Sequence, residues 1–300
     1  MTYSIVARDP ENGQLGVAVQ SHWFSVGTVV TWAEAGVGAV ATQAFADPSY
    51  GPLALALMRG GKSVADALAA LLHADAGRDR RQVGIVDANG AVAAHTGAAC
   101  IAHAGHATAA GVTAQANMMR TDRVWPAMLE TYQQTKGDLA DRLLAALDAA
   151  EAAGGDARGR QSAAMLVVSA VSSGQPWLDR VVDLRVDDSG DPLAELRRLL
   201  TVQRGYRLME KGELREAAGD LDAALRAYEE ARRVMPGSEE AEFWMAILLA
   251  GQGKVAEAKT MFAAVAAREP GWVQVLRALP ATGVFGVGDA LVEALAGAEE

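Results

Sequence analysis

The second residue of the chain has the type and the position to do chemistry. Thr2 follows Met1 directly and begins a strand-like run. A threonine hydroxyl is a weak nucleophile that needs an adjacent base, and a free α-amine on the same residue can supply one. Because an α-amino group titrates at about 7.7–8.0, part of it is neutral near pH 7. Removal of Met1 would therefore make Thr2 a candidate catalytic nucleophile.

Attack by such a nucleophile on a carbonyl also requires donors for the developing oxyanion. Gln43 and Asn117 carry side-chain amides near the ends of predicted strands, and they are candidate donors. Ser21 and His22 follow the second predicted strand and could lie near the α-amine of Thr2. The alternative for all four side chains is an ordinary hydrogen bond in a turn or cap.

Three histidines and the single cysteine of the chain lie close together in the sequence. They are His95, Cys100, His103 and His106. Imidazole and thiolate groups are zinc ligands, but His103 and His106 would face opposite ways on a strand. The glycine-rich segments also lack the Lys-Ser/Thr of a phosphate-binding loop. We therefore expect neither a metal nor a cofactor.

Composition excludes several classes of partner. The 300 residues are 51% hydrophobic and carry a net charge of -10, which argues against binding to nucleic acid or anionic lipid. The apolar runs are shorter than the roughly 20 residues of a membrane span. With one cysteine and no leader-like segment, we expect a cytoplasmic protein.

Residue patterns predict an α+β protein. Apolar runs bounded by turn residues predict strands over 3–8, 14–19, 28–32, 36–43, 81–87, 91–96, 111–117, 162–171 and 178–186. Helical patterns cover 51–59, 63–73, 122–135 and 138–153. This order favours antiparallel sheets over a parallel α/β fold. We expect two sheets packed face to face with a helix pair on each outer face.

Two local signals add detail to this fold. Ser63 with Asp66 three residues later has the form of a helix capping box. Asn89 and Gly90 predict a two-residue hairpin turn, because both residue types tolerate positive φ.

The C-terminal third contains an internal repeat. Gly219, Ala224, Tyr228 and Pro236 recur 34 residues later as Gly253, Ala258, Phe262 and Pro270. This period is typical of tetratricopeptide helical hairpins. Two such repeats are fewer than the three that a free-standing array needs. We expect them to dock on the first domain or to mediate dimerisation, with a peptide-binding groove as the alternative.

Several segments closely resemble a widespread family, the domain of unknown function 1028 family. They are Thr2-Tyr-Ser-Ile-Val-Ala-Arg-Asp-Pro, Gly16-Val-Ala-Val-Gln-Ser, Gly36-Val-Gly-Ala-Val-Ala-Thr-Gln-Ala, Asp47-Pro-Ser-Tyr-Gly-Pro, Arg80-Arg-Gln-Val-Gly and Ala94-His-Thr-Gly with Cys100 and Gly105-His106. The resemblance implies an αββα sandwich of the N-terminal-nucleophile (Ntn) hydrolase type, with Thr2 at the nucleophile position. The resemblance does not identify a substrate, and it assigns a catalytic role to no residue other than Thr2.

The chain departs from proteasome-type Ntn hydrolases at two positions. Its first lysine is Lys62, beside a predicted helix, and Gln20 stands where an acidic residue is expected at the end of the second strand. Both differences argue against a proteasome-like peptidase. Within the family pattern, Ala116 replaces a glycine.

The sequence therefore predicts an Ntn-hydrolase-like domain over residues 1–190 and a tetratricopeptide-like domain over 191–300. The first hypothesis for function is hydrolysis of an amide or ester bond of a small molecule by Thr2 in a homodimer. The alternative is a non-catalytic protein that keeps the sandwich and uses its helical repeats to bind a protein partner or to oligomerise.

Overall fold

Two antiparallel sheets form the centre of the first part of the chain. The computed structural model describes residues 2–283 and 286–297. One sheet has the strand order β10-β9-β2-β1-β8-β7 and the other has the order β3-β4-β5-β6. The strands are β1 (Thr2–Arg8), β2 (Leu15–Ser21), β3 (Thr31–Glu34), β4 (Gly38–Ala44), β5 (Arg81–Asp87), β6 (Val92–Thr96), β7 (Gly105–Ala109), β8 (Val112–Asn117), β9 (Ser162–Val168) and β10 (Arg180–Val186).

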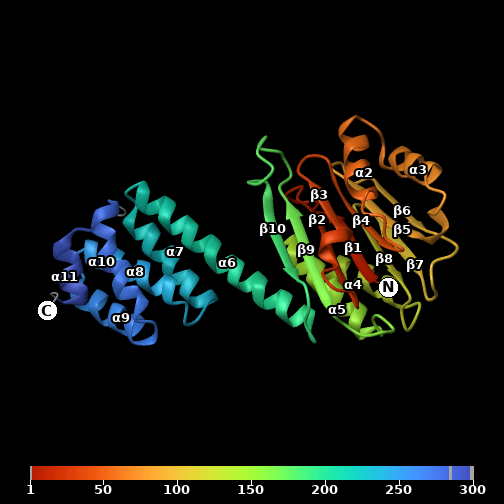
Figure 1. The fold of residues 1–300 in the computed structure, drawn as a ribbon. Coiled ribbons are helices and arrows are strands. Elements are labelled where there is room, and N and C mark those ends of the chain that lie inside the picture. The colour runs from red at the N-terminus through yellow and green to blue at the C-terminus, as the bar shows by residue number, and fades with distance from the viewer. Residues whose placement is uncertain (1, 284–285, 298–300) are drawn as a thin grey trace. The chain divides into compact units, whose positions relative to one another are not determined.

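Helix pairs cover the outer faces of both sheets (Figure 1). Helices α2 (Tyr50–Arg59) and α3 (Val64–Ala74) pack on the four-stranded sheet. Helices α4 (Val124–Gln134) and α5 (Leu139–Ala152) pack on the six-stranded sheet. The architecture is therefore the expected four-layer αββα sandwich.

Residue alternation along β1 decides which side chains face the other sheet. Val6 belongs to the apolar cluster between the sheets. Tyr3 points the opposite way and donates a hydrogen bond from its hydroxyl to Glu151 Oε1 of α5 at 2.6 Å. Because side chains alternate with a period of two, Thr2 and Ser4 share the inward face with Val6. The Ser4 hydroxyl accordingly reaches Gln43 Oε1 on β4 at 2.6 Å.

Two local predictions are confirmed. β1 and β2 pair as an antiparallel hairpin, with Tyr3 opposite Gln20. The Ser63 hydroxyl accepts a hydrogen bond from the Asp66 N–H at 3.1 Å, which caps the first turn of α3.

The sequence predictions were wrong at two strands and at one turn. Residues expected to begin a strand form the short helix α1 (Gly27–Val30) instead, because burial of Val30 in the core overrides its strand propensity. Strand β7 was missed, since its alanines give little strand signal. The Asn89-Gly90 turn is wider than two residues because Asp87 N–H donates to Ala91 O across it at 3.0 Å.

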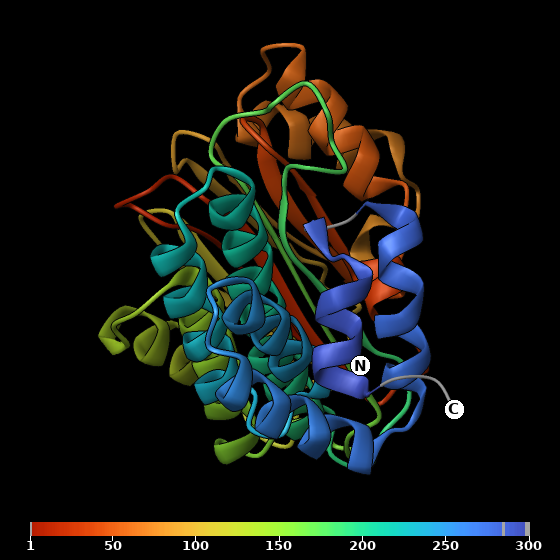
Figure 2. The same cartoon turned by 90° about the vertical axis from the view of Figure 1, so that its left-hand side faces the viewer.

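The remaining helices belong mainly to a second compact unit, Leu200–Glu300, after the first unit, Met1–Leu199. They are α6 (Pro192–Ala217), α7 (Leu221–Val234), α8 (Glu239–Gly251), α9 (Val255–Arg268), α10 (Gly271–Thr282) and α11 (Asp289–Ala296). Helices α7, α8 and α9 pack in succession, as Figure 2 shows in cyan to blue. A short 3-10 helix, η1 (Arg78–Arg80), precedes β5 in the first unit.

The 34-residue repeat is visible in the second unit. Tyr228 and Phe262, one aromatic residue from each repeat, are both buried in its core. Gly219 and Gly253 have φ angles of 78° and 81° in the turns before α7 and α9. Glycine adopts this left-handed conformation without the steric cost that a side chain would add.

Candidate functional site

Thr2 begins β1 and faces the space between the sheets. Its hydroxyl Oγ1 lies 3.0 Å from Ser21 Oγ at the end of β2. Thr2 is 5% exposed and Ser21 is fully buried. The structure thus brings together two of the residues singled out in the sequence.

Gln43 and Asn117 both hold the main-chain carbonyl of Thr2. Gln43 Nε2 donates to Thr2 O at 3.1 Å, and Asn117 Nδ2 donates to the same oxygen at 3.4 Å. Both amides also donate to Gln82 Oε1, at 2.7 Å and 3.0 Å. Their amide hydrogens are therefore directed at Thr2 and Gln82, and this geometry favours positioning of Thr2 over donation to an oxyanion.

Gln82 is a site residue that sequence reasoning missed. Its Nε2 atom lies within hydrogen-bond distance of Thr96 Oγ1 at 3.0 Å and Ala116 O at 2.9 Å. Gln82 on β5 lies opposite Gln43 on β4. Gln82 belongs to the family-like segment Arg80-Arg-Gln-Val-Gly, but its partners become visible only when the strand register is known.

A pocket of about 540 Å³ opens at Thr2, Gln43 and Asn117. This volume lies within the range of about 300–1,000 Å³ that is typical of small-molecule sites. Most of the side chains around it are apolar. They are Trp23, Val26, Val29, Val30, Ala44, Phe45, Ala46, Pro48, Ile101 and Met118. The charged side chains of the lining are Arg81 and Arg158.

The family of unknown function DUF1028 matches residues 2–196 of this chain, which carry the pocket and the amide cluster. The chain belongs to the DUF1028 family. A tetratricopeptide repeat model matches residues 216–279, within the helical unit.

The crystal structure of DUF1028 protein SPO2555 from Silicibacter pomeroyi is similar to this chain. The two are 34% identical and superpose with a TM-score of 0.60, over 66% of this chain and 87% of the other. No match to a curated protein was found.

Unusual backbone conformations border the pocket of this DUF1028 protein. Ala44 and Met118 follow Gln43 and Asn117 directly and have φ angles of 73° and 56°. A left-handed conformation is uncommon for residues other than glycine and concentrates at functional sites. The strands that carry the two amides therefore both turn sharply where they meet the pocket.

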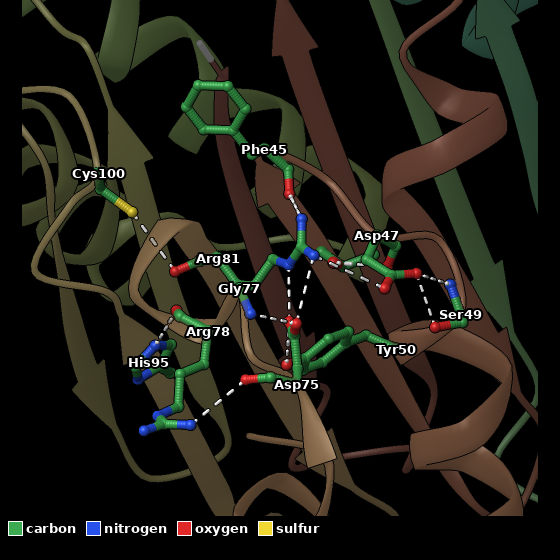
Figure 3. A network of polar contacts seen from close by, with 11 residues as sticks. Phe45, Asp47, Ser49, Tyr50, Asp75, Gly77, Arg78, Arg81, His95 and Cys100 are labelled. Carbon is green, nitrogen blue, oxygen red and sulfur yellow. Dashed lines mark hydrogen bonds and ion pairs between the residues drawn. The ribbon is translucent and has the colours of Figure 1, made fainter. Parts of the chain in front are cut away.

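Arg81 is held in one orientation at the pocket wall (Figure 3). Its Nε donates to Asp75 Oδ2 at 2.8 Å, and its Nη1 donates to Phe45 O at 2.5 Å. The Tyr50 hydroxyl donates to the same Asp75 oxygen at 3.0 Å. The Arg81 guanidinium is the main reason why the pKa of Asp75 falls from 3.8 to about 2.

Replacing Asp75 by Asn is expected to remove an acid-sensitive contribution to the stability of the DUF1028 unit. Because the folded-state pKa is depressed, this stabilisation is present above about pH 4 and is lost as the pH falls towards 2. The difference in Tm between wild type and Asp75→Asn should therefore shrink over this range in scanning calorimetry. A constant difference, or the same change in the exposed-site control Asp79→Asn, would contradict this prediction.

His22 does not join the pocket lining. Its main-chain N–H donates to Asp156 Oδ2 at 3.1 Å, and Arg158 Nη2 donates to the same oxygen at 3.1 Å. The buried His22 Nδ1 atom has no hydrogen-bond partner among the residues that the structure describes. The Asp156–Arg158 pair was not anticipated, because Asp156 lies 134 positions from His22 along the chain.

The two departures from proteasome-type hydrolases lie away from the pocket lining. Gln20 is opposite Tyr3 in the β1–β2 register and therefore shares its face, towards α5. Lys62 is exposed between α2 and α3. Neither side chain lines the pocket where Thr2 lies.

Two of these histidines and the cysteine have other polar contacts. His106 Nδ1 lies 2.8 Å from Thr96 Oγ1, His95 Nε2 lies 3.0 Å from Arg78 O, and Cys100 Sγ lies 3.4 Å from Arg81 O. Within residues 2–283 and 286–297, no group of three His, Cys, Asp or Glu side chains is placed to hold a metal ion. Over the same residues, no helix is long and apolar enough to cross a membrane.

Proposed function

We propose that this DUF1028 protein is an Ntn-type hydrolase that cleaves an amide or ester bond of a small molecule, with Thr2 as nucleophile after removal of Met1. The observation that carries this proposal is the location of Thr2. It is the first residue of β1, and it lines a largely apolar pocket of about 540 Å³ beside the Ser21 hydroxyl.

In the proposed reaction, Thr2 Oγ1 attacks the substrate carbonyl while the Thr2 α-amine accepts the hydroxyl proton. The proton then passes to the leaving amine or alcohol as the C–N or C–O bond breaks, and an acyl ester remains on Thr2. Water activated by the same amine hydrolyses this ester. Ser21 orients the Thr2 hydroxyl. Gln43 and Asn117 fix the Thr2 carbonyl, which restricts where its amine and hydroxyl can lie.

Mass spectrometry of the protein treated with 4-nitrophenyl 3-phenylpropionate tests this proposal. We expect a protein that begins at Thr2 and gains one acyl group on its N-terminal peptide. Hydroxylamine should remove the group, because it cleaves an ester and leaves an amide on the α-amine intact. Retention of Met1, or an adduct at another residue, would contradict the mechanism.

The tetratricopeptide match over residues 216–279 favours a second, compatible function in protein binding. We propose that the helical unit contacts a protein partner or a second copy of the chain. Size-exclusion chromatography with light scattering of the full chain, with and without residues 200–300, would show whether this unit is needed for self-association.

A further inference from the structure

We propose that the substrate of the Thr2 pocket combines an apolar body with a carboxylate. This inference rests on the proposed function for the bond that is cleaved, but the recognition of the substrate can be tested separately. The pocket lining supplies the two observations that carry it: aromatic and aliphatic side chains that are exposed to water, and cationic side chains without an acidic counterpart among the lining residues.

The apolar side of the pocket is incompletely covered. Trp23, Phe45 and Ile101 line it and are 59%, 51% and 46% exposed. Large apolar side chains that gather around a concave site are typical of ligand-binding surfaces. An apolar body placed against them would remove this surface from water and would be stabilised by the hydrophobic effect.

The charged side chains that line the pocket are both basic, although the whole chain carries a net charge of -10. Arg81 and Arg158 belong to the lining, and no Asp or Glu does. The carboxylates that pair with these arginines are Asp75 and Asp47 for Arg81 and Asp156 for Arg158, and none of them belongs to the lining.

Arg81 is oriented in advance for a carboxylate. A guanidinium group has five N–H donors in a fixed plane. Asp75 and Phe45 O take three of these in hydrogen bonds from Nε, Nη1 and Nη2, and Asp47 lies at 4.0 Å from Nη2. The remaining N–H donors of Arg81 can bind a ligand, and the existing contacts already fix the side chain. A ligand carboxylate would therefore bind with little loss of Arg81 side-chain entropy.

Binding of three matched probes to the Thr2→Ala protein tests the inference without requiring catalysis. The probes are 3-phenylpropionate, 3-phenylpropionamide and 3-phenylpropylamine, measured by ligand-observed NMR titration. We expect the carboxylate to bind about ten-fold more tightly than the neutral amide, and the amine to bind most weakly. The carboxylate preference should fall at high salt, because salt screens partly exposed charges. Equal binding of carboxylate and amide, or tighter binding of the amine, would overturn the inference.

Arginine variants locate the charge that is recognised. Arg81→Met and Arg158→Met should each lower the carboxylate preference several-fold, whereas Arg233→Met, on an exposed position of α7, should not. Because either pocket variant could fail to fold, the probe series on the otherwise unchanged chain decides the question by itself.

The two proposals can fail separately. A missing acyl adduct on Thr2 would leave the carboxylate preference intact, and a missing preference would leave the adduct intact.

Discussion

Thr2→Ala is expected to lower the rate of acyl-adduct formation by about 10³-fold or more. Alanine removes the only atom of this residue that can form the ester, and loss of the nucleophile in a serine protease lowers kcat by about 10⁶-fold. Thr2 lies in a buried hydrogen-bonded position, with Gln43 Nε2 on its carbonyl. Because that bond involves the main chain, the variant should keep its fold. Stopped-flow release of 4-nitrophenolate from the activated ester measures the rate.

Thr2→Ser is the matched control for this experiment. Serine keeps both the hydroxyl and the α-amine, so Thr2→Ser should retain most of the initial rapid release of 4-nitrophenolate (the burst). Ser21→Ala should have an intermediate effect, because it removes the hydrogen-bond partner 3.0 Å from Thr2 Oγ1 and leaves the nucleophile in place. Equal burst rates for wild type and Thr2→Ala would remove Thr2 from the mechanism.

Gln82→Leu is expected to destabilise the sandwich by about 3 kcal/mol or more. The substitution removes Gln82 Oε1 as an acceptor for the amides of Gln43 and Asn117, which keep only Thr2 O as a shared acceptor, and it removes the donor to Thr96 Oγ1. It also removes the hydrogen bonds from Gln82 Nε2 to Gly105 O and Ala116 O. Each hydrogen bond lost contributes about 0.5–1.5 kcal/mol, and five are lost together. Because the chain has two compact units, hydrogen exchange of peptides from β1, β5 and β8 is a more specific measurement than global unfolding.

A loss of about 3 kcal/mol corresponds to roughly 100-fold faster exchange in these peptides. The control Gln133→Leu replaces an exposed glutamine on α4 and should leave exchange in the sheets unchanged. Gln82→Glu provides a second comparison, because it keeps the acceptor oxygen but loses the donor. Unchanged exchange in Gln82→Leu would show that the amide cluster does not stabilise the sandwich.

Local patterns in the sequence predicted much of the fold. The β1–β2 hairpin, the Ser63 cap and the 34-residue repeat each depend on residues that are close in sequence or recur at a fixed interval. Strand β7 and helix α1 show where this approach fails. In α1, burial of Val30 against the core selected a helix for a segment whose residue types favour a strand.

The candidate site was only partly predictable. Thr2 could be recognised because its chemistry depends on two groups of one residue. Ser21 could be expected near it because Ser21 follows the second strand of the predicted hairpin. The sequence could not show that His22 lies outside the pocket lining. Its position depends on the end of β2 and on a hydrogen bond to Asp156, which is far away in the sequence.

The sequence by itself determined the candidate nucleophile, the β1–β2 hairpin and the repeat in the helical unit, since each is encoded over a few residues or by a period. Only the tertiary structure decided that Gln82 joins Gln43 and Asn117, because these residues are 39 and 35 positions apart along the chain. Their contact depends on the register of two strand pairs and on the packing of two sheets. A slip of one residue in either register would turn an amide to the opposite face.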